Sequence, residues 1–242
     1  LRRTQRAKKD RPVRAVGSKA GKHVAHTDAG PDERRGVNQA YAPETLAIGF
    51  ARRFAACKRA GLLVADPDGL RALLSNPDRP VQILFSGKSH PADGPGQDTL
   101  QRVYQFSRDP AFAGRIAVLE NYTMTLARLL VGGVDLWLNT PRRPYEASGT
   151  SGMKAALNGV VNCSILDGWW EEGYDPVAGW RIGDRETADS EPEQDRRDAN
   201  ALYDLLENEI VPLYYRRGED GPPGGWVRMM KGSMANLAVR FS

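Results

Sequence analysis

The feature that most constrains the fold is a repeated alternation of short apolar runs and longer amphipathic stretches, which begins at Thr45. Apolar runs of this length are typical of buried strands, and the amphipathic stretches between them are typical of helices. Strands that alternate with helices at this spacing indicate βαβ units, which build a parallel sheet with helices on both faces. The sequence therefore predicts an α/β fold with a Rossmann-like parallel sheet. We expect strands at 46–49, 81–86, 115–119, 134–138 and 160–165, and helices at 55–65, 98–107, 124–131, 151–157, 199–215 and 226–239.

The N-terminal part of the chain has a different composition. Residues 1–40 hold eleven Lys or Arg against four Asp or Glu, few apolar side chains and no helical or strand period. Such a segment cannot bury enough apolar area to offset its ordering entropy. A nucleic-acid-binding arm is one interpretation, but no aromatic residues interleave the charges to stack on bases. We therefore expect a basic leader at 1–43, disordered or loosely packed, then one domain at 44–242, and no nucleic-acid partner.

Two further observations exclude classes of protein. No apolar run approaches the ~20 residues that a membrane span needs, so we expect no membrane partner. The two cysteines, Cys57 and Cys163, fall in different predicted elements. We expect both to be free thiols in a reducing, cytoplasmic compartment.

The strongest motif is a loop of small residues that runs from Glu146 to Lys154 with the sequence EASGTSGMK. A glycine-rich loop that opens a helix presents unpaired backbone N–H groups and the positive end of the helix dipole, which favour an anion. Thr150 and Ser151 add hydroxyl donors, and Lys154 follows one turn later. A lysine beside a phosphate site can bind phosphate or form a Schiff base with an aldehyde. A capping loop with a solvated lysine is an equally weighted alternative from the loop alone.

A second group of basic residues follows the first predicted strand, at Arg52, Arg53, Lys58 and Arg59. Cations at the carboxyl end of a strand suit an anionic ligand, whereas a solvated helix face would carry the same charges without function. We assign Arg59 to such a face. Arg52 and Arg53 directly follow the apolar strand, which favours a binding role for them.

The chain resembles the α-glucan (glycogen, starch and maltodextrin) phosphorylases, in particular their short bacterial branch. Five segments occur in the same order as in that family: IGFARRF with KR at 48–59, GKSHPAD at 87–93, ENY at 120–122, VDLWLNTPRRPYEASGTSGMKAALNG at 134–159 and LDGWWEEGYD at 166–175. The resemblance covers nearly all of residues 44–242. It implies the C-terminal, cofactor-binding domain of a two-domain architecture of the glycosyltransferase-B type, with the N-terminal domain missing.

The resemblance also implies a role for each matching residue. The cofactor is pyridoxal 5′-phosphate, bound to Lys154 as a Schiff base and surrounded by Thr150, Ser151, Gly152, Arg52, Tyr122 and Thr123. Inorganic phosphate binds to Arg53 and Lys58. The glucosyl hydroxyls bind to Glu146, Ser148 and Gly149. The implied partners are an α-glucan, inorganic phosphate and the missing N-terminal domain. A homo-oligomer is an open alternative to a monomer, and the resemblance implies no metal.

The implied reaction is phosphorolysis of α-1,4-glucan to glucose 1-phosphate with retention at the anomeric carbon. Its catalytic residues would be Lys154, Arg53 and Lys58, with Lys154 as an anchor and not a base. A glycoside hydrolase would need two carboxylates that flank the scissile bond, and no such pair is evident in these loops. The cationic residues would instead offset two adjacent phosphate groups and stabilise an oxocarbenium-like transition state.

The chain departs from the family at Cys57, where the family has a tyrosine, and in its leader and its much shorter length. Two alternatives follow. An inactive or partial fragment of a phosphorylase is one of them. The other is a sugar-nucleotide glycosyltransferase similar to glycogen synthase, which needs a cationic phosphate site but no Schiff-base lysine at the position of Lys154.

Three weaker signals remain open at this stage. His90 lies after a strand, and we leave it out of the catalytic residues. Trp169 and Trp170 could stack on sugar rings or pack in the core. The pair Arg142 and Arg143 could organise the EASGTSGMK loop or form an ion pair with Glu146.

Overall fold

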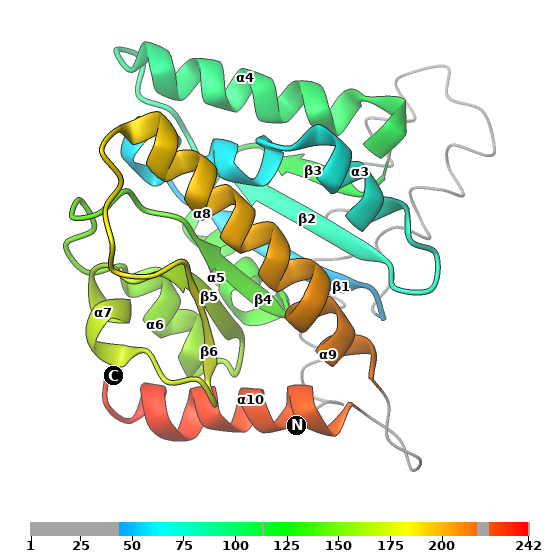
Figure 1. Ribbon diagram of the computed structural model, residues 1–242, viewed down its shortest axis with the longest axis vertical. Coiled ribbons are helices and arrows are strands. Elements are labelled where there is room, and N and C mark those ends of the chain that lie inside the picture. Colours follow the sequence, from blue (N-terminus) through cyan, green and yellow to red (C-terminus); the bar gives the residue numbers. More distant parts are fainter. Residues whose placement is uncertain (1–43, 113, 217–222, 242) are drawn as a thin grey trace.

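The computed structural model describes residues 44–112, 114–216 and 223–241. Its centre is a sheet of six parallel strands in the order β3-β2-β1-β4-β5-β6 (Figure 1). The strands are β1 (Leu46–Ala51), β2 (Val81–Ser86), β3 (Ile116–Leu119), β4 (Leu136–Asn139), β5 (Val161–Ile165) and β6 (Gly179–Ile182). This is the strand order of a doubly wound Rossmann-like sheet, which confirms the predicted fold class.

Helices connect and cover the strands. In chain order they are η1 (Ala56–Lys58), η2 (Ala60–Val64), α3 (Pro67–Ser75), α4 (Gly94–Arg108), η3 (Pro110–Phe112), α5 (Met124–Gly133), α6 (Thr150–Leu157), α7 (Trp169–Gly173), α8 (Glu191–Leu205), η4 (Leu206–Ile210), α9 (Val211–Tyr215), α10 (Gly224–Gly232) and η5 (Ser233–Ala238). None of the helices in the described parts of the chain is both long and apolar enough to cross a membrane.

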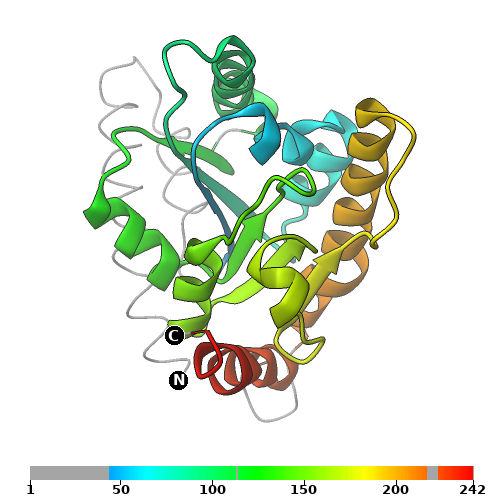
Figure 2. The same cartoon turned by 90° about the vertical axis from the view of Figure 1, so that its left-hand side faces the viewer.

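Alternate residues of β1 pack into two separate cores, as strand geometry requires. Leu46, Ile48 and Phe50 belong to a large apolar cluster with residues of α3 and α8. Ala47 and Ala51 belong to a second cluster with residues of α5 and α6. The two sets of helices accordingly lie on opposite faces of the sheet (Figure 2). All six residues of β1 are buried, which explains why this strand reads as a continuous apolar run.

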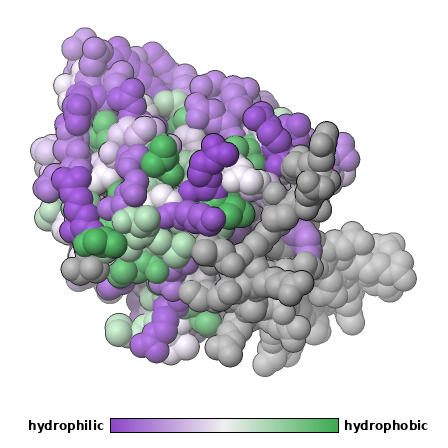
Figure 3. Space-filling view, turned by 90° about the horizontal axis from the view of Figure 1, so that it is seen from below, coloured by the Kyte–Doolittle hydropathy of each residue, from purple (hydrophilic) through white to green (hydrophobic). Residues whose placement is uncertain are grey.

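Helix α10 and the π-helical segment η5 lie along one end of the molecule, and Figure 3 views the molecule from that side. Apolar side chains occur there in small groups among polar ones. Val177 and Val239 are exposed apolar residues, and Leu237 of η5 is buried in a cluster with Trp169 and Trp170. The C-terminal helices therefore complete the core around α7.

The strand order reverses between β1 and β4, which are hydrogen-bonded neighbours. In open α/β sheets the chain turns to opposite faces at such a point and leaves a crevice at the carboxyl ends of the strands. The loops after β1 and β4 contain the basic residues and the EASGTSGMK loop that the sequence singled out. The topology therefore brings these two motifs to one place.

The structure differs from the sequence prediction in several elements. The single helix expected at 55–65 is wrong: two short 3₁₀ helices occur there, because Arg59 between them has φ 47° and an α-helix cannot continue through that conformation. Helix α8 begins at Glu191 and not near 199, since Ser190 caps it and Pro192 follows in its first turn. Strand β6 and helices α3 and α7 were not predicted. The leader at 1–43 lies outside the described residues.

Candidate functional site

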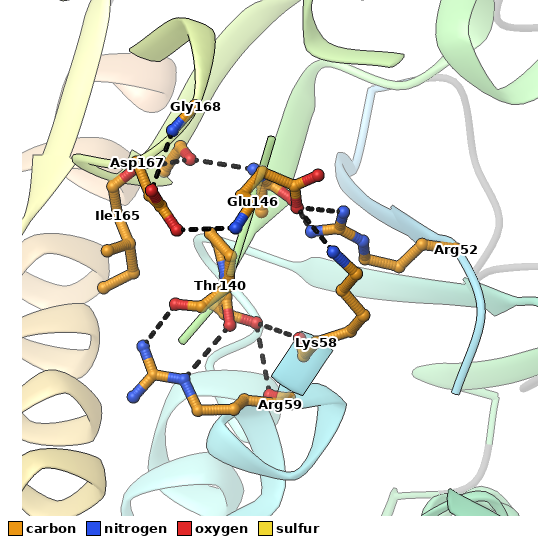
Figure 4. Close-up of polar contacts among 11 residues, drawn as sticks. Arg52, Lys58, Arg59, Thr140, Glu146, Ile165, Asp167 and Gly168 are labelled. Atoms are coloured by element: carbon orange, nitrogen blue, oxygen red, sulfur yellow. Dashed lines mark hydrogen bonds and ion pairs between the residues drawn. The ribbon is translucent and has the colours of Figure 1, made fainter. Parts of the chain in front are cut away.

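The loops after β1 and β4 meet through an ionic cluster at the carboxyl ends of these strands (Figure 4). The guanidinium of Arg52 donates hydrogen bonds to the side-chain oxygen of Asn139 and to the Glu146 carboxylate. The ammonium of Lys58 donates to the same Glu146 oxygen, Oε2, at 3.1 Å. We call Arg52, Lys58 and Glu146 the site cluster. The structure thus brings together three of the residues that the sequence predicted for the site.

The site cluster is shielded from water but not sealed. The side chains of Arg52 and Lys58 are each 12% exposed and that of Glu146 is 8% exposed. Burial by itself raises the pKa of the Glu146 carboxyl, but the charges and hydrogen bonds of Arg52 and Lys58 outweigh it, so the net pKa is lower than usual. Glu146 is therefore a carboxylate at neutral pH, and it neutralises part of the positive charge beside it.

Positive charge and donor capacity remain in excess at this site. The Nε atom of Arg52 is buried and has no hydrogen-bond partner among the described residues. Arg53 is exposed and forms no ion pair with any residue that the structure describes. Two cations (Arg52 and Lys58) thus share one carboxylate, and Arg53 is a third cation in the same loop. Because buried donors are nearly always paired in folded proteins, an orphaned guanidinium N–H beside a second cation points to an anionic ligand.

The EASGTSGMK loop leads into α6 with an open first turn. Gly149 is the N-cap, with φ 90°, and no side chain caps the helix. The N–H of Gly152 already donates to the carbonyl of Gly149 at 3.0 Å, which leaves Thr150 and Ser151 as the first-turn residues whose N–H groups can meet a ligand. Lys154 lies one turn later on α6 with an exposed side chain.

Tyr122 and Thr123 follow β3, and Thr123 has a structural task. Tyr122 is partly buried against the second core cluster. Burial raises the pKa of its phenol, and the charge of Arg52 lowers it in part. The Thr123 hydroxyl caps α5 by accepting the N–H of Leu126 at 3.3 Å. Its predicted contact with a ligand stays a prediction.

Comparison with known proteins identifies the group to which this site belongs. The sequence model of the carbohydrate phosphorylases matches residues 68–172. The maltodextrin phosphorylase of Thermococcus litoralis is 52% identical over 216 residues, which are 87% of this chain and 25% of that protein. The glycogen phosphorylase of Aquifex aeolicus is 49% identical over 198 residues, which are 82% of this chain and 28% of that protein.

The chain belongs to the carbohydrate phosphorylase family. It spans about a quarter of the length of the curated relatives that it matches, including the glycogen phosphorylase of Mycobacterium tuberculosis, which is 48% identical over 84% of this chain and 24% of its own. Among solved structures, a point mutant of S. aureus TarM in complex with fondaparinux, α-GlcNAc-glycerol and UDP superposes on 82% of this chain and 33% of its own, with a TM-score of 0.53 at 14% identity. That likeness concerns the fold alone.

The glycines of this phosphorylase-family loop are required by packing inside the protein. A Cβ on Gly152 would lie 2.7 Å from Nε1 of Trp169 and 2.9 Å from Oδ1 of Asn162. These two contacts explain why position 152 is a glycine. Trp169 and Trp170 are 4% and 0% exposed, so core packing, and not stacking on sugars, describes them.

Sequence reasoning missed a buried acid that fixes the backbone of Glu146. Asp167 follows β5, and its Oδ2 accepts the N–H of Glu146 at 2.9 Å while its Oδ1 accepts the N–H of Gly168 at 2.9 Å. The carbonyl of Ser148 accepts the N–H of Trp169 at 2.7 Å. The loop that carries Glu146 is thus tied to the chain that follows β5. A polar residue directly after a buried strand was the available signal.

Two assignments of basic residues are corrected by the structure. Arg59 is not on a solvated face: it is 6% exposed and its guanidinium pairs with Asp195 and Asp198 of α8 at 2.9 and 2.7 Å. Arg142 also pairs with α8, at Asp195, and not with Glu146. A fully buried guanidinium between two carboxylates is a structural anchor.

The remaining candidates lie apart from the site. Arg143 lies 4.0 Å from Glu171 and donates to the carbonyl of Arg185 at 3.1 Å. His90 is exposed, and its Nδ1 accepts the N–H of Ala92 at 3.1 Å within its own loop. Cys57 and Cys163 are free thiols, as predicted. Neither Arg143 nor His90 contributes to the site cluster.

Proposed function

We propose that this chain is the cofactor- and phosphate-binding part of an α-1,4-glucan phosphorylase, which splits glycogen, starch or maltodextrin with inorganic phosphate and releases glucose 1-phosphate. The observation that supports it most is the meeting of Arg52 and Lys58 with Glu146 at the switch point of the sheet. Relatives that are named glycogen and maltodextrin phosphorylases match 82–87% of the chain.

The residues at the site fit pyridoxal 5′-phosphate. The unpaired Nε of Arg52 and the open first turn of α6 at Thr150 and Ser151 are donors suited to the phosphate of that cofactor. The exposed amine of Lys154 would anchor the cofactor covalently, and the partly buried ring of Tyr122 would line it. When bound, this group supplies a second phosphate that can share a proton with the substrate phosphate.

The chain's own residues would perform three tasks in the reaction. Arg53 and Lys58 would bind inorganic phosphate, and Lys58 already lies beside the carboxylate of Glu146. Glu146, with Ser148 and Gly149, would bind glucosyl hydroxyls and so hold the anomeric carbon next to that phosphate. Fixed cations in a shielded site stabilise the negative charge that persists through the transition state.

The arrangement of carboxylates supports phosphorolysis over hydrolysis. A glycoside hydrolase needs two carboxylates that face the scissile bond. Glu146 is paired with two cations, and Asp167, which follows β5, is buried and accepts two backbone N–H groups. Attack by phosphate on the face from which the glucan leaves would give retention at the anomeric carbon.

The rest of the longer relatives' chain would supply the opposite wall of the glucan cleft. This chain corresponds to 25% of the Thermococcus litoralis protein, and we propose that it is the C-terminal domain and that turnover requires the missing part. The free thiols of Cys57 and Cys163 support a cytoplasmic location.

Cofactor attachment tests this proposal directly. The chain is incubated with pyridoxal 5′-phosphate, reduced with borohydride and mapped by mass spectrometry. We expect one adduct, on Lys154, which is lost in Lys154→Met. Lys88→Met serves as the matched control, because Lys88 is another exposed lysine after a strand of the same sheet. Labelling that spreads over Lys88 and Lys231 as readily as Lys154 would contradict the proposal.

A further inference from the structure

We propose that Arg59 is a positioning residue for the phosphate-binding Lys58, which it holds in place by clamping the loop after β1 against the loop after β4 and against α8. This role rests on the proposed function, in which Lys58 binds inorganic phosphate. Arg59 itself does not face the site cluster: its guanidinium points away from Lys58 toward the other loop (Figure 4).

Every nitrogen of the Arg59 guanidinium has a partner. Nε donates to the carbonyl of Thr140 at 3.2 Å and Nη2 to the carbonyl of Pro141 at 2.6 Å. Nη1 pairs with Asp195 at 2.9 Å and with Asp198 at 2.7 Å. One side chain, 3% exposed, therefore joins three segments of the chain. We call Arg59, Asp195 and Asp198 the clamp.

The loop after β4 also contacts the main chain at Lys58 through Thr140. The hydroxyl of Thr140 lies 3.1 Å from the carbonyl of Lys58 and 3.2 Å from the carbonyl of Arg59, and donates to them. Thr140 is 1% exposed. The main chain at Lys58 is thus held from the loop that also leads to Glu146, the partner of the Lys58 ammonium in the site cluster.

The local backbone needs such an anchor. Lys58 ends η1, a three-residue 3₁₀ helix that has no buried residue, so apolar packing does not fix it. Arg59 then adopts φ 47° and ψ 44°, a left-handed conformation that costs free energy for any residue with a Cβ. Such a conformation persists only where the surroundings over-determine it, and the buried contacts of the Arg59 side chain do so.

The positioning role of Arg59 is tested by measuring the affinity of the full chain for inorganic phosphate at matched ionic strength. The second measurement is the yield of the Lys154 adduct with pyridoxal 5′-phosphate. The variants are Lys58→Met, Arg59→Met, Arg59→Gly and Thr140→Val. Arg59→Gly is informative because glycine adopts φ 47° without strain but lacks the clamp. Arg197→Met is the control, since Arg197 lies on α8 with a 54% exposed side chain that pairs, among the described residues, with Glu193 alone.

We expect Lys58→Met to abolish phosphate binding, and both Arg59 variants to weaken it about ten-fold, as loss of a residue that orients a ligating group commonly does. Thr140→Val should weaken it about three-fold. The Lys154 adduct should stay at the wild-type level in all of these variants, because the bonds of Arg59 and Thr140 go to other segments than α6. Arg197→Met should change neither readout.

Each other result has a defined meaning. Arg59→Gly and Thr140→Val variants that bind phosphate within about two-fold of wild type overturn the positioning role while the proposed function stands. A parallel loss of phosphate binding and of the Lys154 adduct shows a merely structural role and also overturns it. If Arg59→Met does not fold, Thr140→Val decides alone, because valine has nearly the volume of threonine. Wild-type phosphate binding that survives Lys58→Met refutes the proposed phosphate site, and the inference with it.

Discussion

Lys58 and Arg59 are neighbours in the sequence, yet they enter two ionic clusters of opposite character. The site cluster has more positive than negative charge, side chains that are 8–12% exposed and an orphaned N–H on Arg52. In the clamp, two carboxylates pair with Arg59, one of them (Asp195) also pairs with Arg142, and every guanidinium nitrogen of Arg59 is engaged. Complete pairing is typical of an anchor, whereas unmet hydrogen-bonding capacity indicates a place for a ligand.

The difference also explains why charge alone could not separate the two groups. The four residues after β1 that carry positive charge look alike in the sequence. The left-handed backbone at Arg59 directs its side chain away from the site cluster and toward α8. Mutations in the two clusters are therefore expected to change different properties of the protein. Loss of a clamp residue should lower stability, whereas loss of a site residue should chiefly alter ligand binding.

The largest effect should come from opening the clamp. Arg59→Met leaves Asp198, whose side chain is 7% exposed, without its cation. Removal of one partner from a buried ion pair costs about 3–5 kcal/mol, so we expect a loss of that size in the free energy of unfolding, measured by denaturant titration. The control Arg197→Met removes an exposed i,i+4 pair and should cost about 0.5 kcal/mol or less. Equal losses in both variants would contradict the contrast between buried and exposed pairs.

The next effect tests whether the start of α6, beside the site cluster, is held by packing. In Gly152→Ala the new Cβ would meet the Trp169 ring at 2.7 Å. Overpacking of this kind costs about 1–3 kcal/mol, to be read from thermal unfolding. Gly94→Ala is the control, because a Cβ there meets no atom within 4 Å. A Gly152→Ala variant as stable as Gly94→Ala would show that the loop is free to adjust.

The sequence was sufficient for most of the repeated pattern of strands and helices. Five of the six strands were predicted, and four of them, β1, β2, β4 and β5, are buried throughout and read as apolar runs. The resemblance to the α-glucan phosphorylases assigned Arg52, Lys58 and Glu146 to one site, and the structure places their side chains in one ionic cluster. Their roles toward ligands stay predictions.

The missed features depend on contacts between distant segments. Strand β6 has the short sequence GWRI with an exposed Arg181, and only its pairing with β5 makes it a strand. The burial of Arg59 arises from α8, more than 130 residues along the chain. Asp167 acts through a backbone N–H at Glu146. No local pattern encodes the pairing of β6 or the burial of Arg59, and the polar residue that follows β5 was the one local sign of Asp167.

A smaller effect should separate the two clusters by their response to phosphate. Glu146→Gln leaves Arg52 and Lys58 without their carboxylate, and we expect a loss of about 1 kcal/mol in stability, since a glutamine oxygen can still accept from them and Arg52 keeps its bond to Asn139. Added inorganic phosphate should raise the thermal midpoint of this variant more than that of wild type, because a ligand that binds only the native state stabilises it. Chloride at matched ionic strength is the control. Phosphate that stabilises Arg59→Met to the same extent would remove the distinction between the clusters.

The smallest effect is the pH dependence that Glu146 adds. Because its pKa in the folded chain is lower than usual, Glu146 contributes stability above the ordinary carboxyl pKa, and that stability is lost as the pH falls through the folded-state value. The difference in unfolding free energy between wild type and Glu146→Gln should therefore be constant near neutral pH and shrink below about pH 4.5. Acid effects that the two proteins share cancel in this difference. A difference that grows on acidification would mean that burial, and not the pairing with Arg52 and Lys58, controls the carboxyl group.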